Sequence, residues 1–270
     1  MSPIADSALL DALLPVAVAA GHEAHAVYLR GCPVEQKADR TPVTEADHAA
    51  EAVILQHLAR LAPQVPVVAE ESCAAGRIPV VGDVFFLVDP LDGTKEFIAR
   101  RGDFTVNIAL IRAGQPVLGV VYAPVTGMLY AGEVAAGRAF RCAQPPDAAA
   151  PGAREPLHVR AAPPAGLIAV VSRSHATPET EQYLLGYPVS ERVSVGSSLK
   201  FCLVASGAAD LYPRLGPTME WDTAAGHAVL VAAGGQVLAP DGRALRYGKP
   251  DFRNSFFVAA GAFPLTPLAA

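Results

Sequence analysis

The chain has 270 residues, of which 51% are hydrophobic and only 17% are charged. This length and composition predict a compact folded protein with one large or two small domains and ample material for a core. The net charge of −5 argues against a polymeric nucleic acid as partner, but a small anionic substrate fits if a metal or a local basic patch receives it.

The cysteines and the amino-terminal stretch bear on cellular location. The four cysteines are scattered and form no CxxC pair, which argues against a zinc knuckle or a disulfide framework and favours a reducing, cytoplasmic setting. The amino terminus carries no basic cluster, and Pro15 interrupts its alanine-rich stretch, which we interpret as too short to span a bilayer. The sequence therefore predicts a cytoplasmic protein without stable membrane insertion.

The amino-terminal part of the chain predicts two helices and a short strand. Apolar positions over residues 7–29 indicate a helix kinked near Pro15. Thr44 and Asp47 form a capping-box pattern that opens a second helix, so Asp47 has a good explanation as a helix-start residue. Residues 65–69 are typical of a strand that ends in two acids, which are usually just solvated at such a place.

The next strand also ends in acids. Residues 84–88 predict a buried strand that delivers Asp89 to its carboxyl end, and Pro90 presets a bend that places Asp92 on a tight loop. Two carboxylates that lie so near to each other either repel or share a cation. The alternative is an ordinary strand exit with solvated aspartates. Because ligands of open α/β sheets bind beyond the carboxyl ends of strands, two acidic strand ends in succession favour a site.

The remainder of the chain predicts an antiparallel meander followed by an alternation of strands and helices. The meander consists of strands at residues 104–111, 117–122 and 128–131, separated by hairpin signals. A stretch rich in Pro and Ala follows, and we place a boundary there between a domain at 1–150, which carries most of the metal site, and a domain at 151–270, which closes the substrate site. The second domain is predicted to contain, in order, a strand at 167–171, a helix at 177–185, a strand at 189–195, a helix at 197–205, a strand at 209–212 and a helix at 222–233.

Four carboxylates at element boundaries are candidates for metal binding: Glu70, Asp89, Asp92 and Asp222. Hard oxygen donors suit magnesium, which takes few protein ligands alongside waters and phosphate oxygens. Taken alone, Asp222 is most simply the N-cap of the last helix. Thr94 offers a hydroxyl that orients a water, and Gly93 and Thr94 present backbone N–H groups to an anion if they begin a helix.

Three segments resemble the signature motifs of the inositol monophosphatase superfamily, in the right order and spacing: Glu70-Glu-Ser72, Asp89-Pro-Leu-Asp-Gly-Thr94 and Trp221-Asp-Thr-Ala-Ala-Gly226. The similarity runs from about residue 41 to residue 235. It implies an α/β (α+β) fold, a layered αβαβα sandwich with an antiparallel N-terminal sheet and a smaller C-terminal domain with a mixed sheet. It also implies a metal-dependent, lithium-sensitive phosphomonoesterase.

Further segments resemble the 3′(2′),5′-bisphosphate nucleotidase branch of that superfamily: Lys95-Glu-Phe97, Ser172-Arg-Ser-His175, Gly196-Ser-Ser-Leu-Lys-Phe201 and Leu211-Tyr-Pro-Arg214. That branch removes the 3′-phosphate of adenosine 3′,5′-bisphosphate, which implies a role in sulfur metabolism. Two alternatives stay open: an inositol monophosphatase or broad sugar-phosphate phosphatase, and a nucleotide-binding protein that has lost the chemistry.

The resemblance implies two or three magnesium ions. Carried over residue by residue, one ion is held by Glu70, Asp89 and the main-chain carbonyl of Leu91, and a second by Asp89, Asp92 and Asp222. Thr94, paired with Glu70, positions and activates the attacking water, and Asp47 has a supporting catalytic role. These assignments also place Leu91, Asp92, Gly93, Thr94 and Asp222 beside the substrate.

The second phosphate and the nucleoside need other groups. Lys200 and Arg214 are the candidates for the phosphate, and Ser197 and His175 lie near the nucleoside by family analogy. Each has a plain alternative: Lys200 as a solvated helix residue, Arg214 as a surface charge and His175 as a solvated loop histidine. The alanine-rich surface helices permit a homodimer.

Overall fold

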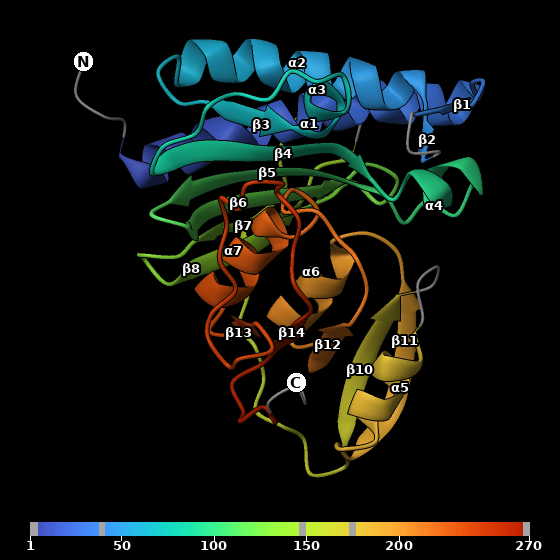
Figure 1. The fold of residues 1–270 in the computed structure, drawn as a ribbon, viewed down its shortest axis with the longest axis vertical. Coiled ribbons are helices and arrows are strands. Elements are labelled where there is room, and N and C mark those ends of the chain that lie inside the picture. The colour runs from blue at the N-terminus through green and yellow to red at the C-terminus, as the bar shows by residue number, and fades with distance from the viewer. Residues whose placement is uncertain (1–4, 38–40, 146–149, 173–176, 267–270) are drawn as a thin grey trace.

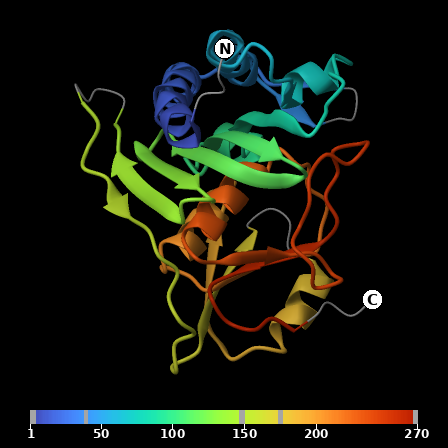
Figure 2. The ribbon, with the colours of Figure 1, turned by 90° about the vertical axis from the view of Figure 1, so that its left-hand side faces the viewer.

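The computed structural model describes residues 5–37, 41–145, 150–172 and 177–266. The elements stack in layers, as Figure 1 shows: helices α1 and α2, a seven-stranded sheet, helices α6 and α7, and a five-stranded sheet with α5 beside it. Figure 2 shows the same order after a turn of 90°. The layered α/β fold predicted from the resemblance is confirmed.

The outer layer is formed by α1 (Asp6–Arg30) and α2 (Glu45–Leu61). By length and composition, α1 could cross a membrane, so the prediction that this stretch is too short was wrong: the helix runs through Pro15 without a break. Its inner face, however, is occupied, because Leu10, Leu13 and Ala17 are fully buried in the core between the helices and the large sheet.

The large sheet has the order β3-β4-β5-β6-β7-β8-β9, with β3 parallel to β4 and every other pair antiparallel. Three of its strands are the predicted meander. The strands are β3 (Val67–Ala69), β4 (Val84–Asp92), β5 (Thr105–Arg112), β6 (Gln115–Ala123), β7 (Met128–Glu133), β8 (Arg138–Ala143) and β9 (Glu155–Pro156). A two-stranded sheet, β1 (Glu35–Gln36) with β2 (Pro42–Val43), lies apart from it.

Both faces of the large sheet are covered. Side chains alternate along a strand, so Phe86 and Val88 of β4 pack in the core with α1 and α2, whereas Phe85 and Leu87 pack in the core with α6 and α7. This is why β4 is apolar at every residue from Val84 to Val88 rather than at every second residue.

Helix α7 (Ala224–Ala232) approaches the sheet closely because glycines face it. A Cβ at Gly119 of β6 would lie 2.3 Å from the carbonyl oxygen of Ala225, and one at Gly132 of β7 would lie 2.7 Å from Cα of Val229. The backbone contact fixes the helix start and, with it, the preceding Asp222.

The five-stranded sheet is mixed, as predicted: β10 is parallel to β11 and β12, while β14 is antiparallel to β12 and β13. The elements are β10 (Leu167–Ser172), α5 (Pro178–Leu184), β11 (Val189–Val195), α6 (Leu199–Ala205), β12 (Leu211–Arg214), β13 (Gln236–Leu238) and β14 (Phe257–Ala260). Because β9 pairs with β8 and α7 packs on the large sheet, the two parts share a core, and a boundary at residue 150 stays a prediction.

Candidate active site

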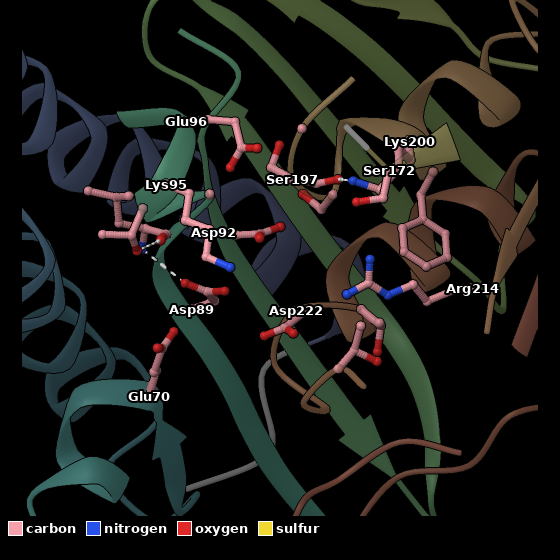
Figure 3. Close-up of a pocket in the computed structure, with 18 of the residues that line it drawn as sticks. Glu70, Asp89, Asp92, Lys95, Glu96, Ser172, Ser197, Lys200, Arg214 and Asp222 are labelled. Atoms are coloured by element: carbon pink, nitrogen blue, oxygen red, sulfur yellow. Dashed lines mark hydrogen bonds between the residues drawn. The ribbon is translucent and has the colours of Figure 1, made fainter. Parts of the chain in front are cut away.

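Strand β4 carries two aspartates and runs on to the second. Asp89 lies opposite Asn107 of β5 and Asp92 lies opposite Thr105, so the two residues between the aspartates form an irregularity in the ladder. The predicted tight loop at Asp92 was therefore wrong. The bulge turns both carboxylates toward one cavity (Figure 3), and Asp89 Oδ1 accepts a 3.0 Å hydrogen bond from the N–H of Leu91.

The strand ends at Asp92, and the next residue, Gly93, has a φ of +100° and precedes the short helix α4 (Thr94–Ile98). The positive φ favours glycine, and a Cβ there would also make a tight 3.1 Å contact with the carbonyl oxygen of Asp103. This turn brings Thr94 into the lining of the cavity that Asp89 and Asp92 also line.

Glu70 comes from the neighbouring strand. Ala69 of β3 pairs in parallel with Val88 of β4, so the next residues along the two strands, Glu70 and Asp89, leave the sheet at the same edge. Glu70 begins helix α3 (Glu70–Ala74), and the buried Glu51 of α2 holds this helix by accepting the N–H of Glu71 at 2.8 Å and the hydroxyl of Ser72 at 2.6 Å.

Asp222 reaches the cavity from the opposite side, in the loop before α7. The helix begins at Ala224, and its N-cap residue, Thr223, makes no side-chain cap hydrogen bond. The prediction that Asp222 caps the helix was wrong, since its Oδ2 instead accepts the N–H of Met219 at 2.9 Å. The contact leaves the rest of the carboxylate directed at the site.

The carboxylates repel one another. Burial and the charges of Glu70, Asp92 and Asp222 raise the pKa of Asp89 well above its usual range, and burial with the charges of Asp92 and Glu70 does the same to Asp222. Burial raises the pKa of Asp92 to about 6, against the attraction of Lys200. The site therefore has an excess of negative charge that favours a cation.

Asp47 has two roles in the geometry. Its Oδ2 accepts the N–H of Thr44 at 2.8 Å and the Thr44 hydroxyl at 2.7 Å, which completes the predicted capping box of α2. Its Oδ1 lies 3.3 Å from the hydroxyl of Thr94. Thr94 thus lies beside Asp47, and its predicted pairing with Glu70, which lines the same cavity, stays a prediction.

The cation beside Glu70 is Lys37, which the sequence did not single out. Its Nζ lies 2.6 Å from Glu70 and 2.7 Å from Glu71. Burial alone would lower the pKa of Lys37, but the two carboxylates outweigh it and raise it. In turn, burial raises the pKa of Glu71 to about 7 despite the hydrogen bond from Lys37.

Two further cations, Lys200 and Arg214, line the far wall of the cavity and are only 5% and 8% exposed, which removes their plain alternatives as solvated residues. Lys200 Nζ donates to the carbonyl of Ser197, and burial lowers its pKa to about 8 against the attraction of Asp92. Arg214 donates to the carbonyl of Pro217 at 2.8 Å, and its Nε has no hydrogen-bond partner among the described residues.

One cavity of about 250 Å³ brings together nearly all of the predicted site residues. Its lining includes Glu70, Asp89, Leu91, Asp92, Gly93, Thr94, Ser197, Lys200, Arg214 and Asp222, with Lys95, Glu96 and Ser172 of the branch motifs. Asp47 joins through Thr94, and His175 lies outside the described residues. Among those described, no group of three or more Asp, Glu, His or Cys side chains lies close enough together to hold a metal ion by itself.

Comparisons of the sequence and the fold with known proteins identify a family. The model of the inositol monophosphatase family matches residues 6–264. The chain belongs to the inositol monophosphatase family. The family resemblance seen in the motifs is thereby confirmed.

Curated proteins similar to this chain include nucleotidases. The chain is 46% identical to the 3′(2′),5′-bisphosphate nucleotidase CysQ of Escherichia coli K12 over 259 residues, 92% of this chain and 100% of that protein. The CysQ of Haemophilus influenzae is 33% identical over 94% of this chain and 93% of its own. The crystal structure of CysQ from Bacteroides thetaiotaomicron superposes with a TM-score of 0.80 and 38% identity, covering 97% of this chain and 100% of that chain. An inositol monophosphatase from Anabaena superposes with a TM-score of 0.73 and 27% identity, covering 95% and 92% of the two chains.

Proposed function

We propose that the protein is a magnesium-dependent phosphomonoesterase that removes the 3′-phosphate of adenosine 3′,5′-bisphosphate to give AMP and phosphate. One observation carries the choice of substrate: the cavity has Glu70 and Asp89 on one wall, and two buried cations, together with Asp222, on the other. A substrate with a single phosphate leaves the second wall without a partner. The names of the CysQ relatives agree with a bisphosphate.

The acids fit magnesium because they are oxygen donors whose repulsion a divalent cation would relieve. Glu70, Asp89 and the carbonyl of Leu91 would hold one ion, and Asp89, Asp92 and Asp222 a second. A third ion is compatible with magnesium held mainly by water. When bound, magnesium supplies positive charge that polarises the phosphoryl group and activates water.

The chain's own groups orient the reaction. When the Thr94 hydroxyl donates to Asp47, the Thr94 oxygen is free to accept a hydrogen from a water in the cavity, which positions that water. The water oxygen bonds to phosphorus as the bond to the ribose 3′-oxygen breaks, and the released oxygen takes up a proton. We assign the proton of the attacking water to Glu70, with Asp47 acting through Thr94.

Lys200 and Arg214 would bind the 5′-phosphate, since a buried guanidinium with an unpaired Nε and a buried ammonium both gain from an anion. Ser197, in the same wall, and Leu91, Asp92 and Gly93, beside the scissile phosphate, complete the proposed substrate contacts. His175 stays a prediction for the nucleoside.

We make three further proposals: a cytoplasmic location, lithium sensitivity and a homodimer. All four cysteines are free, which supports a reducing, cytoplasmic location without requiring it. The predicted lithium sensitivity and homodimer are likewise retained.

Phosphate release tests the function. Adenosine 3′,5′-bisphosphate, inositol 1-phosphate and fructose 1,6-bisphosphate are compared with magnesium and with EDTA. We expect strong preference for the nucleotide and loss on chelation. Equal turnover of inositol 1-phosphate would keep the chemistry but replace the substrate by that of the broader phosphatases. Magnesium-dependent release from none of the three would favour a nucleotide-binding protein without catalysis.

A further inference from the structure

The start of β5 presents two polar side chains to the second half of the chain. Alternate residues of the strand share a face, and Ala109 packs with Phe201 of α6 on that face while Ile108 packs toward α1 and α2. Thr105 and Asn107 continue the face of Ala109 to the edge of the cavity. Both are buried, with at most 1% exposed, so their hydrogen bonds must be satisfied within the protein.

Ser198, the residue before α6, lies against both side chains. Its Oγ is 2.7 Å from Asn107 Oδ1 and 2.9 Å from Thr105 Oγ1. An amide oxygen only accepts, so the single hydroxyl hydrogen of Ser198 goes to Asn107, and Thr105 must donate to Ser198.

The direction of these hydrogen bonds fixes the Asn107 amide. With its oxygen held by Ser198, the amide turns its Nδ2 to Asp92, whose Oδ2 lies 3.4 Å away. Asp92 also accepts the backbone N–H of Ser198. Ser198, from the C-terminal half, therefore acts on Asp92 by two routes: directly through its main chain, and through Asn107 by its hydroxyl.

The same turn carries the groups assigned to the substrate. Ser197 has a φ of +50°, a left-handed conformation that is uncommon for serine, and its carbonyl accepts from Lys200 Nζ. Unfavourable backbone conformations persist where surrounding contacts impose them, often at ligand sites. Here those contacts come from Lys200 on one side and from Ser198 on the other.

We propose that Thr105, Ser198 and Asn107 form a positioning relay that orients Asp92 for metal binding and couples Asp92 to the substrate-binding turn. The inference rests on the proposed function. If the relay transmits, an anion that orders the turn at Lys200 strengthens metal binding, and metal binding strengthens anion binding by the same factor, because coupling between two binding sites is reciprocal.

Magnesium affinity of the full chain, measured by isothermal titration calorimetry with and without AMP, tests the relay. Ser198→Ala removes the hydroxyl but keeps the N–H that Asp92 accepts. We expect it to weaken magnesium binding roughly tenfold, the size of effect usual for partners of metal ligands. AMP should tighten magnesium binding to the wild type, and this tightening should be lost in the variant.

A second pair keeps the test independent of folding defects. Thr105→Val has nearly the shape of threonine but lacks the hydroxyl, whereas Thr105→Ser keeps it. We expect the valine variant to lose magnesium affinity in the same direction as Ser198→Ala and the serine variant to retain it. Thermal unfolding in EDTA identifies any variant that has merely lost stability.

The outcomes separate the two proposals. If the wild type binds magnesium, and Ser198→Ala and Thr105→Val both bind it with unchanged affinity and unchanged AMP coupling, the relay alone is overturned. Equal loss in Thr105→Val and Thr105→Ser would also overturn it, because the hydroxyl would not be the cause. A wild type that binds no magnesium would overturn the proposed function and the relay with it.

Discussion

The hydroxyl of Thr94 lies 3.3 Å from Oδ1 of Asp47, while Oδ2 of the same carboxylate caps helix α2. The capping explanation and the catalytic explanation of Asp47 are therefore not alternatives. The helix cap holds the carboxylate in place, and burial raises its pKa despite the hydrogen bonds from Thr44. A structural motif and a site thus share one side chain.

Replacing Thr94 should separate chemistry from stability. Without the hydroxyl, the attacking water loses the group that orients it, so we expect Thr94→Ala to lower kcat by about 100-fold or more, as for lost acid–base partners. Thr44→Ala is the matched control: it should cost about 1 kcal/mol of unfolding free energy through the lost hydroxyl cap but change kcat only a few-fold, because the Thr44 N–H still donates to Asp47. Steady-state kinetics and urea unfolding measure both. Comparable kcat losses in the two variants would contradict the assignment.

Asp89→Asn should affect turnover and metal-free stability in opposite directions. Asp89 is 1% exposed and faces three other carboxylates, so removing its charge removes repulsion. We expect turnover to be abolished, since the residue is assigned to both magnesium ions, and the unfolding free energy in EDTA at neutral pH to rise. Near-normal turnover would show that Asp89 does not bridge two metals.

Lys37 should stabilise the metal-free protein. Its ammonium pairs with the buried Glu71 and with Glu70, whose side chain is 26% exposed, and Lys37→Met would leave both carboxylates without this partner at a cost of about 3 kcal/mol. The control is Arg30→Met, which removes an ion pair with Glu45 at the exposed surface and should cost less than about 1 kcal/mol. Urea unfolding in EDTA compares them. If both variants cost the same, the ion pairs of Lys37 contribute no more than a surface pair.

Sequence patterns predicted the parts of the site that are local. Glu70 and Asp89 each follow a short apolar strand, and that pattern alone places them at the edge of a sheet. The prediction that Asp222 caps the helix was wrong because the local pattern of a helix start does not reveal that α7 begins two residues later. The packing of α7 against Gly119 sets that register.

The contacts that complete the site connect residues far apart in the chain. Lys37 and Glu70 are 33 positions apart, and Ser198 and Asn107 are 91 apart. No periodicity or motif in one sequence encodes such pairs. The burial of Lys200 was unpredictable for the same reason, because the cover over its helix comes from other elements.

Lys200 should matter for a bisphosphate more than for a monophosphate. Lys200→Met keeps a buried side chain of similar length but removes the charge assigned to the 5′-phosphate. A charge-assisted hydrogen bond contributes about 1.5–3 kcal/mol, so KM for adenosine 3′,5′-bisphosphate should rise roughly ten- to hundredfold, with little change for inositol 1-phosphate. Arg243→Met, at an exposed position, matches the charge change. A loss equal for both substrates would remove the second-phosphate role.

His227 makes the free energy of unfolding depend on pH. It is buried in α7, its Nδ1 lies 2.9 Å from the Tyr247 hydroxyl, and that hydroxyl is 3.2 Å from Thr223. Burial lowers the pKa of His227 from 6.5 to about 3. The folded protein therefore excludes a proton that the unfolded chain binds, so this contribution is complete above pH 6.5 and is lost as the pH falls toward 3.

We expect His227→Gln to flatten the acid dependence of unfolding. Across the first two pH units below 6.5, the wild type should lose roughly 2 kcal/mol more than the variant, because each unit of pKa difference corresponds to about 1.4 kcal/mol. Tyr247→Phe removes the hydrogen bond but leaves the imidazole to titrate, so it should lower stability without flattening the slope. Urea unfolding in EDTA, with metal binding removed as a variable, measures the slopes. If the glutamine variant keeps the wild-type slope, His227 is not a source of the acid sensitivity.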